Sequence, residues 1–166
     1  MGGSGDWSTA AGNSGMINVG PAAITARLPN VFLKGGSGTK ALTVTSGQNV
    51  LDGGMGSAFL AGGSGTDTSF VDVRNSNAVW NTLTNFHVGG AVMVWGRTPG
   101  AGTETVAAQA GAAGYQGATL SLADGQGGGA SDVTFAGLSA SQVAHLQAST
   151  GSVGGIPYLY FYNPGA

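Results

Sequence analysis

Residues 35–70 read GGSGTKALT, VTSGQNVLD, GGMGSAFLA and GGSGTDTSF, which are four units of nine residues without insertion or deletion. The fourth place of every unit is a glycine, and the eighth place is leucine in the first three units and Ser69 in the last. The register continues upstream through ARLPNVFLK and INVGPAAIT, which put Leu33 and Ile24 in the eighth place. Six consecutive units therefore share one register.

This repeat predicts a solenoid in which each unit supplies a glycine-rich turn followed by a short strand. Alternation along a strand points the eighth residue inward and the seventh and ninth residues outward. Two units make one coil, so equivalent residues recur every 18 positions and stack at roughly 4.8 Å. The narrow interior is expected to be lined by Ile24, Leu33, Leu42, Leu51 and Leu60.

The composition of the whole chain agrees with an all-β solenoid. Of its 166 residues 33 are glycine and only 7% are charged, which disfavours a helical enzyme because glycine costs about 1 kcal/mol inside a helix. Hydrophobic residues still make up 42%, too much for a disordered linker. We therefore expect a folded, largely β protein.

Charge and apolar runs exclude several kinds of partner. The net charge is -2 and the five basic residues are spread singly, so no basic stripe is available for nucleic acid. No run approaches the 18 apolar residues or so that a membrane span needs. The first 15 residues show neither the basic start nor the apolar stretch of a cleavable signal peptide. The chain has no cysteine, which removes disulfides and thiolate metal sites from consideration.

The nonapeptide units resemble the calcium-binding repeats of RTX proteins, whose pattern is Gly-Gly-x-Gly-x-Asp-x-aliphatic-x and whose fold is a parallel β-roll. The closest unit is residues 62–70, with Asp67 in the sixth, acidic place. The segment 81–96, NTLTNFHVGGAVMVWG, is similar to the acidic segment that follows the roll in such proteins. The resemblance implies an extracellular protein exported by a type I machinery.

The resemblance also implies calcium, bound between neighbouring turns by sixth-place carboxylates and backbone carbonyls. Here the sixth places sort into one stack without any carboxylate and a second stack with one. The first stack is Ala22, Lys40 and Ala58, and the second is Val31, Asn49 and Asp67. We therefore expect at most one weak calcium site, formed by Asn49 and Asp67 with the backbone carbonyls of Gly62 and Ser64.

Acidic residues are missing after the roll as well, since Asn81, Asn85 and Gly90 stand where the resemblance implies aspartate. A roll with aspartate at every turn is held open by repulsion until calcium binds, so losing the carboxylates removes the repulsion and the metal requirement together. We therefore predict a solenoid that folds largely without calcium.

Beyond the roll we expect a C-terminal region of short antiparallel strands, arranged like a sandwich, that caps the open end of the solenoid. The predicted organisation is a Gly/Ser-rich segment over 1–16, the β-roll over 17–70 and the antiparallel cap over 71–166. The stretch LSASQVAHLQA predicts one helix, capped by Ser139 or Ser141, with Val143 and Leu146 on one face.

Three surface features are expected from the register and from strand alternation. Lys34 and Asp52 are expected to be neighbours of opposite charge one coil apart. The outward residues Phe32, Val50 and Phe59 are apolar, so either the C-terminal half covers them or they form an assembly surface. The C-terminal IPYLYFY puts Tyr158, Tyr160 and Tyr162 on one face, which is expected to be internal; the alternative is an adhesive or carbohydrate-facing strip.

No pattern in the chain indicates catalysis. The two histidines, His87 and His145, stand outside any catalytic motif, although a triad or metal centre with Asp132 or Asp124 is imaginable. The stretch GGSGTK, residues 35–40, lacks the Gly-Lys-Ser/Thr of a phosphate loop and is interpreted as a solenoid turn. We expect no enzyme.

Two functions fit these observations. The first is a non-catalytic, secreted RTX-like scaffold and secretion module with at most weak calcium binding, whose partner is the type I export machinery. The second is a structural subunit that binds further copies of itself into a fibre or surface layer, through the solenoid ends and the apolar outer faces.

Overall fold

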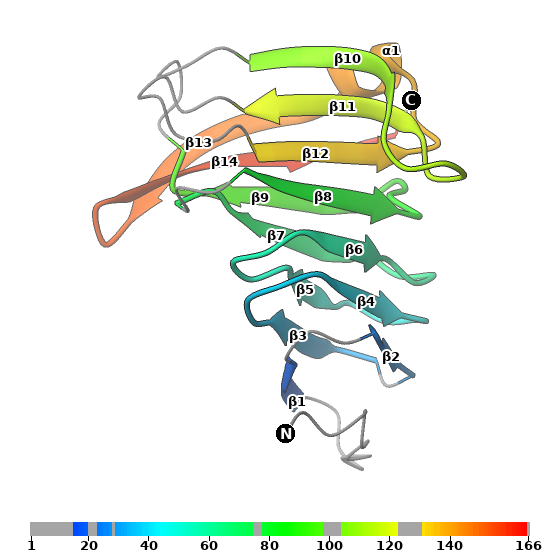
Figure 1. Ribbon diagram of the computed structural model, residues 1–166, viewed down its shortest axis with the longest axis vertical. Coiled ribbons are helices and arrows are strands. Elements are labelled where there is room, and N and C mark those ends of the chain that lie inside the picture. Colours follow the sequence, from blue (N-terminus) through cyan, green and yellow to red (C-terminus); the bar gives the residue numbers. More distant parts are fainter. Residues whose placement is uncertain are drawn as a thin grey trace.

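The computed structural model describes residues 15–19, 23–27, 29–74, 78–97, 104–122 and 131–165. These residues form two seven-stranded sheets that face each other across a single core (Figure 1). Figure 1 shows the coils stacked along the long axis of the molecule, from β1 and β2 near one end to β10 at the other. The predicted all-β fold, a parallel β-roll followed by antiparallel strands, is confirmed.

The roll alternates between the two sheets, because each turn carries the chain from one sheet to the other. The first sheet takes β1 (Gly15–Val19), β3 (Val31–Gly35), β5 (Val50–Asp52), β7 (Thr68–Asp72) and β9 (Ala91–Trp95). The second sheet takes β2 (Ala23–Ala26), β4 (Lys40–Val44), β6 (Ala58–Ala61) and β8 (Val79–Thr84). Neighbouring strands within each sheet of the roll are parallel.

The eighth-place leucines point inward, as the alternation predicts. Leu33 pairs with Leu51 in one sheet and Leu42 pairs with Leu60 in the other, so stacked residues are 18 positions apart. All four side chains are at most 1% exposed. Ile24 is partly buried and packs against the same core. The repeat therefore builds the narrow apolar interior directly.

The strands do not become antiparallel at residue 71, so the expected start of the antiparallel region there is wrong. β8 and β9 still pair in parallel with β6 and β7, and Leu60 stacks on Leu83. The chain spends 23 residues on this coil instead of 18, because the turn after β7 is longer. Strand pairing depends on backbone groups, so the ladder continues after the side-chain repeat has stopped.

The antiparallel region therefore begins only beyond β9. In the second sheet β8 is followed by β12 (Ser131–Ala136), still parallel, and then by the antiparallel β11 (Gly117–Leu122) and β10 (Glu104–Ala110). In the first sheet β9 is followed by the antiparallel β14 (Ile156–Tyr162) and β13 (Gln147–Val153). Of the predicted segment 1–16, the described residues include only Gly15 and Met16, which belong to β1.

The predicted helix is present as α1 (Ala140–Ala144), which contacts β10 and β11. Ser139 is its N-cap: its side chain accepts the Gln142 N–H, and the Gln142 side chain accepts the Ser139 N–H in return. Val143 and Leu146 are buried in the core. The helix thus covers apolar core residues at the end of the stack where the sheets become antiparallel.

The outer surface confirms the expected ion pair and shows the C-terminal half covering one of the three outward apolar residues, Phe59. Lys34 Nζ lies 3.2 Å from Asp52 Oδ2, and the two residues are paired in adjacent strands. Phe59 is covered by Tyr115 from the β10–β11 turn, with ring centroids 5.3 Å apart. Phe32 and Val50 are half-buried on the outer face of the first sheet.

The tyrosine face of β14 is the outer face, so the expectation that it is internal is wrong. Leu159 is buried and Phe161 packs against the core, which places the alternating tyrosines outside. Tyr158 stacks on Trp95 of β9 with ring centroids 6.1 Å apart. A neighbouring aromatic ring, rather than burial in the core, shields this tyrosine.

Candidate functional site

The sixth-place residues stand where each turn enters its strand, and they form two stacks along the roll. In the second sheet Lys40 pairs with Ala58, and Ala58 pairs with Asn81. In the first sheet Val31, Asn49 and Asp67 follow one another at the starts of β3, β5 and β7. Ala22 lies outside the described residues. We call these the lysine stack and the aspartate stack.

The aspartate stack brings Asn49 and Asp67 together, as the sequence predicts. Asn49 is 2% exposed and Asp67 is 7% exposed. Asp67 Oδ1 accepts the Asn49 backbone N–H at 3.1 Å and the Asn49 Nδ2 at 2.7 Å. Asp67 Oδ2 accepts the Gly63 N–H at 2.7 Å. Both carboxylate oxygens are therefore engaged by N–H donors.

These residues do not fit a calcium ion in the arrangement that the structure shows. Calcium takes six to eight oxygen ligands, whereas the Asn49 amide turns its NH₂ toward Asp67 and its oxygen toward the Val31 N–H, at 3.0 Å. The expected carbonyl ligand Gly62 accepts Asn85 Nδ2 at 2.9 Å. Ser64 is exposed, and its N–H donates to the Thr45 carbonyl.

Hydrogen bonds within the stack thus satisfy the polar side chains that were expected to bind the metal. The same asparagine and aspartate side chains that suggest a metal site in the sequence connect Val31, Asn49 and Asp67 in one chain of bonds. A buried carboxylate with three N–H donors is compensated without a cation.

The lysine stack contains a buried ammonium, which the repeat pattern alone did not indicate as a functional group. Lys40 is 3% exposed, and its Nζ donates to the carbonyls of Gly36 and Gly53, each at 2.7 Å. These carbonyls belong to two successive turns on one side of the roll. Burial lowers the pKa of Lys40 below 10.5, and the nearby charge of Asp52 opposes that shift. The sequence feature that could have indicated this site is the basic residue in a sixth place, because a sixth-place side chain is expected to point between neighbouring turns.

Asn85, in the turn after β8, also bonds backbone carbonyls of a neighbouring turn, on the opposite side of the roll. Its Nδ2 donates to the carbonyls of Gly62 and Gly63, both at 2.9 Å. Asn85 adopts φ +57, a left-handed conformation that asparagine tolerates better than most residues. In both places a side-chain N–H donor fills the space between turns.

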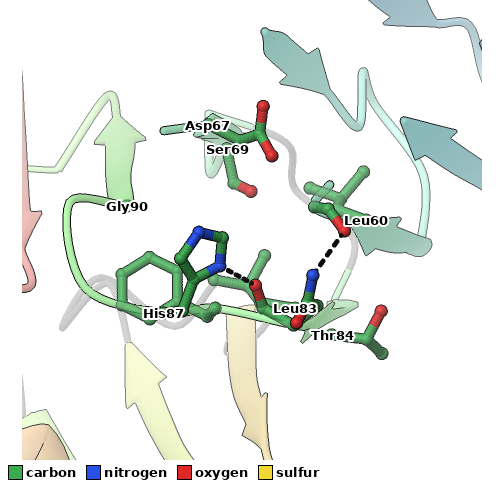
Figure 2. A pocket seen from close by; sticks show the side chains of 10 residues that line it. Leu60, Asp67, Ser69, Leu83, Thr84, His87 and Gly90 are labelled. Atoms are coloured by element: carbon green, nitrogen blue, oxygen red, sulfur yellow. Dashed lines mark hydrogen bonds between the residues drawn. The ribbon is translucent and has the colours of Figure 1, made fainter. Parts of the chain in front are cut away.

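A small cavity lies inside the last coil of the roll, beside Asp67 (Figure 2). Its volume is about 10 Å³, and Leu60, Ser69, Leu83 and His87 are among the residues that line it. This is room for about one water molecule, so the cavity does not admit an organic substrate. Figure 2 shows the His87 ring beside the cavity, with its Nδ1 bonded to the Asn85 carbonyl at 2.9 Å.

The imagined catalytic partners are not brought together. His145 bonds the Ser141 carbonyl of its own helix, and Asp132 accepts the Ser121 hydroxyl. Asp124 lies outside the described residues. Within the described ranges no three His, Cys, Asp or Glu side chains gather into a metal-binding group. No helix in that part of the chain is long and apolar enough to cross a membrane.

No family model, no curated protein and no solved structure matches this chain.

Proposed function

We propose that this chain is a non-catalytic extracellular scaffold module, of the kind found at the C-terminal end of RTX-like bacterial proteins exported by type I machineries. The observation that carries the proposal is the set of hydrogen bonds between turns. Lys40, Asn49, Asp67 and Asn85 bind their neighbours directly across successive coils. Such a roll is held by its own side chains where related rolls rely on calcium.

The continuity of the two sheets also supports a mechanical role. Each sheet runs without interruption from the roll into the C-terminal strands, and the core is one cluster throughout. A rigid stack of this kind holds its two ends at a fixed separation, which suits spacing and presentation of an attached domain. The export route itself rests on the sequence resemblance.

Thermal melts with calcium and with a chelator test the calcium part of the proposal. We expect the melting temperature to change by no more than about 2 °C, because Asn49 and Asp67 are already satisfied by hydrogen bonds. Even a weak site, with calcium present at a concentration equal to its Kd, would stabilise the fold by only about 0.4 kcal/mol. The Asp67→Asn variant is the control, since it removes the one carboxylate of the predicted site. A chelator-induced collapse to random coil in the natural sequence would overturn this part.

Fusion of a passenger domain to the N-terminus of the full chain tests the export part. In bacteria that carry a type I exporter the passenger should accumulate in the medium, and in matched cells without the exporter it should stay inside. Retention of the passenger in both strains would contradict the proposal, provided that the fusion is folded.

A second candidate is a self-assembling structural subunit. Among the described residues the edge strands of the first sheet are β1 and β13, and those of the second sheet are β2 and β10. Val106 on β10 is 46% exposed and Val153 at the end of β13 is 59% exposed. A sheet edge with exposed apolar residues can act as a template for pairing with another chain.

Size-exclusion chromatography with electron microscopy separates the two candidates. Self-assembly predicts large particles or fibres that Val106→Lys abolishes, because a charge on an edge strand opposes pairing. A monomer at all concentrations, unchanged by the substitution, leaves the scaffold as the function.

A further inference from the structure

The path of the Lys40 side chain is built into the repeat. Lys40 starts at the beginning of β4 and passes directly over Gly35, where an added Cβ would lie 2.2 Å from Lys40 Cδ and 2.8 Å from the Gly53 carbonyl oxygen. Only glycine at this position leaves room for the chain of methylenes. The ammonium is thereby guided between the turn of residues 35–38 and the turn of residues 53–56.

The end of this path is a cage of backbone carbonyls. Gly36 and Gly53 offer their oxygens from two successive coils, and Lys40 Nζ contacts both at 2.7 Å. This distance is typical of charge-assisted bonds. Carbonyl dipoles that converge from two turns make a site of negative potential, and the nearby Asp52 carboxylate adds to it.

The neighbouring residues of the lysine stack offer no other charge to this cage. Ala58, the next sixth-place residue, has only a methyl group, and Asn81 is neutral. Asp52 is itself engaged, since its Oδ2 pairs with Lys34 and its Oδ1 accepts the Gly54 N–H. Lys40 is therefore the cation that balances the converging carbonyls.

We propose that the Lys40 ammonium is a tethered cation that occupies a cation site between the Gly36 and Gly53 carbonyls, and that this site takes a free primary ammonium ion once the tether is removed. The side chain links two coils in the same way as a bound ion would. Because this cation is covalently attached, its binding does not depend on the ionic composition of the medium.

The two lysines of the chain allow a direct test on the natural protein. Lys34 has a side chain that is 50% exposed, so it is an internal control for Lys40. Reductive methylation of the folded chain, read by mass spectrometry, should modify Lys34 at least ten times faster than Lys40. In denaturant the two rates should converge. Equal rates in the folded protein would overturn the proposal.

Chemical rescue tests the cation site itself. Lys40→Ala removes three methylenes and the ammonium, which together match propylammonium, whereas Lys40→Met fills the path without a charge. In tetramethylammonium chloride both variants should melt about 2 to 12 °C below the natural protein, because the buried Gly53 carbonyl loses its donor, whereas the exposed Gly36 carbonyl can bind water instead. Propylammonium chloride at equal ionic strength should restore at least half of that loss in Lys40→Ala only.

Two results would overturn the site. One is a Lys40→Met variant that melts at the temperature of the natural protein. The other is a folded Lys40→Ala variant that gains no more from propylammonium than from tetramethylammonium. If neither variant folds, the relative methylation rates of Lys34 and Lys40 in the natural protein test whether Lys40 is held in the site. The calcium melts test the proposed function independently of this result.

Discussion

The closeness of the stacked turns is set at single glycines. A Cβ built on Gly65 would lie 1.8 Å from the carbonyl oxygen of Gly47 in the turn below, far inside any real contact. The same holds at Gly56, where it would lie 2.2 Å from the Gly38 oxygen. At these two fourth places glycine is therefore required by backbone packing between coils, whereas Gly38 and Gly47 adopt a positive φ.

Replacement of Gly65 by alanine should weaken the roll strongly. We expect Gly65→Ala to lower the free energy of unfolding by about 3 kcal/mol or more, because the coils must separate to admit the methyl group. Urea denaturation measures the change. Gly114→Ala is the control: unlike Gly65, Gly114 has a positive φ of 84°, but nothing lies within 4 Å of its added Cβ, so a loss of about 1 kcal/mol from backbone strain alone is expected. Equal losses would contradict the packing argument.

The lowered pKa of Lys40 predicts a pH dependence with a definite sign. Between the folded pKa and the unfolded value of 10.5 the unfolded chain binds more protons, so the free energy of unfolding should rise with pH across this window. The neutral amine still has two N–H groups for the two carbonyls. Urea denaturation from about pH 8 upward tests this. This increase in the free energy of unfolding should be missing in Lys40→Met. An increase of equal size in that variant would show that other titrating groups cause it.

At the scale of elements, α1 shows how a short helix is made stable enough to cover a core. It has five residues, too few for independent stability. The reciprocal bonds between Ser139 and Gln142 hold its first turn, and Val143 and Leu146 fix it to the strands below. Cap and apolar contacts together keep it in place.

Removal of the cap should cost a moderate amount of stability. Ser139→Ala leaves the Gln142 N–H without its acceptor, and we expect the free energy of unfolding to fall by about 0.5 to 2 kcal/mol. Chemical denaturation gives the value. Ser152→Ala on the exposed strand β13 should change it by less than about 0.5 kcal/mol. A similar loss in both variants would speak against the cap.

At the scale of the whole molecule, the roll and the antiparallel region share their sheets. β8 pairs with β6 on one side and β12 on the other, and β9 pairs with β7 and β14. No strand pairing is lost at the place where the repeat ends. The two regions should therefore unfold together.

Calorimetry tests this cooperativity. The chain should show one unfolding transition, and Leu51→Ala in the roll and Leu120→Ala in β11 should each lower that same transition. Both side chains are buried, and each truncation should cost about 2 to 5 kcal/mol. Two transitions, each sensitive to only one substitution, would show that the roll and the C-terminal region are separate folding units.

The nonapeptide pattern was sufficient to predict the coil of 18 residues, the inward leucines and the neighbouring positions of Asn49 and Asp67. These features follow from local periodicity, because alternation along a strand fixes which side chains face inward. The ion pair of Lys34 and Asp52 was predictable for the same reason. Both depend only on counting residues within one uninterrupted register.

The sequence by itself determined the parallel roll and which residues face its core. Only the tertiary structure decided how the polar side chains between the turns are used. Lys40 reaches a carbonyl 13 residues away and Asn85 reaches carbonyls 22 and 23 residues away. The direction of an amide or ammonium group is set by the donors and acceptors of adjacent coils, which come together only when the coils stack. A periodic pattern specifies where a side chain begins, and the packed neighbours specify what it binds.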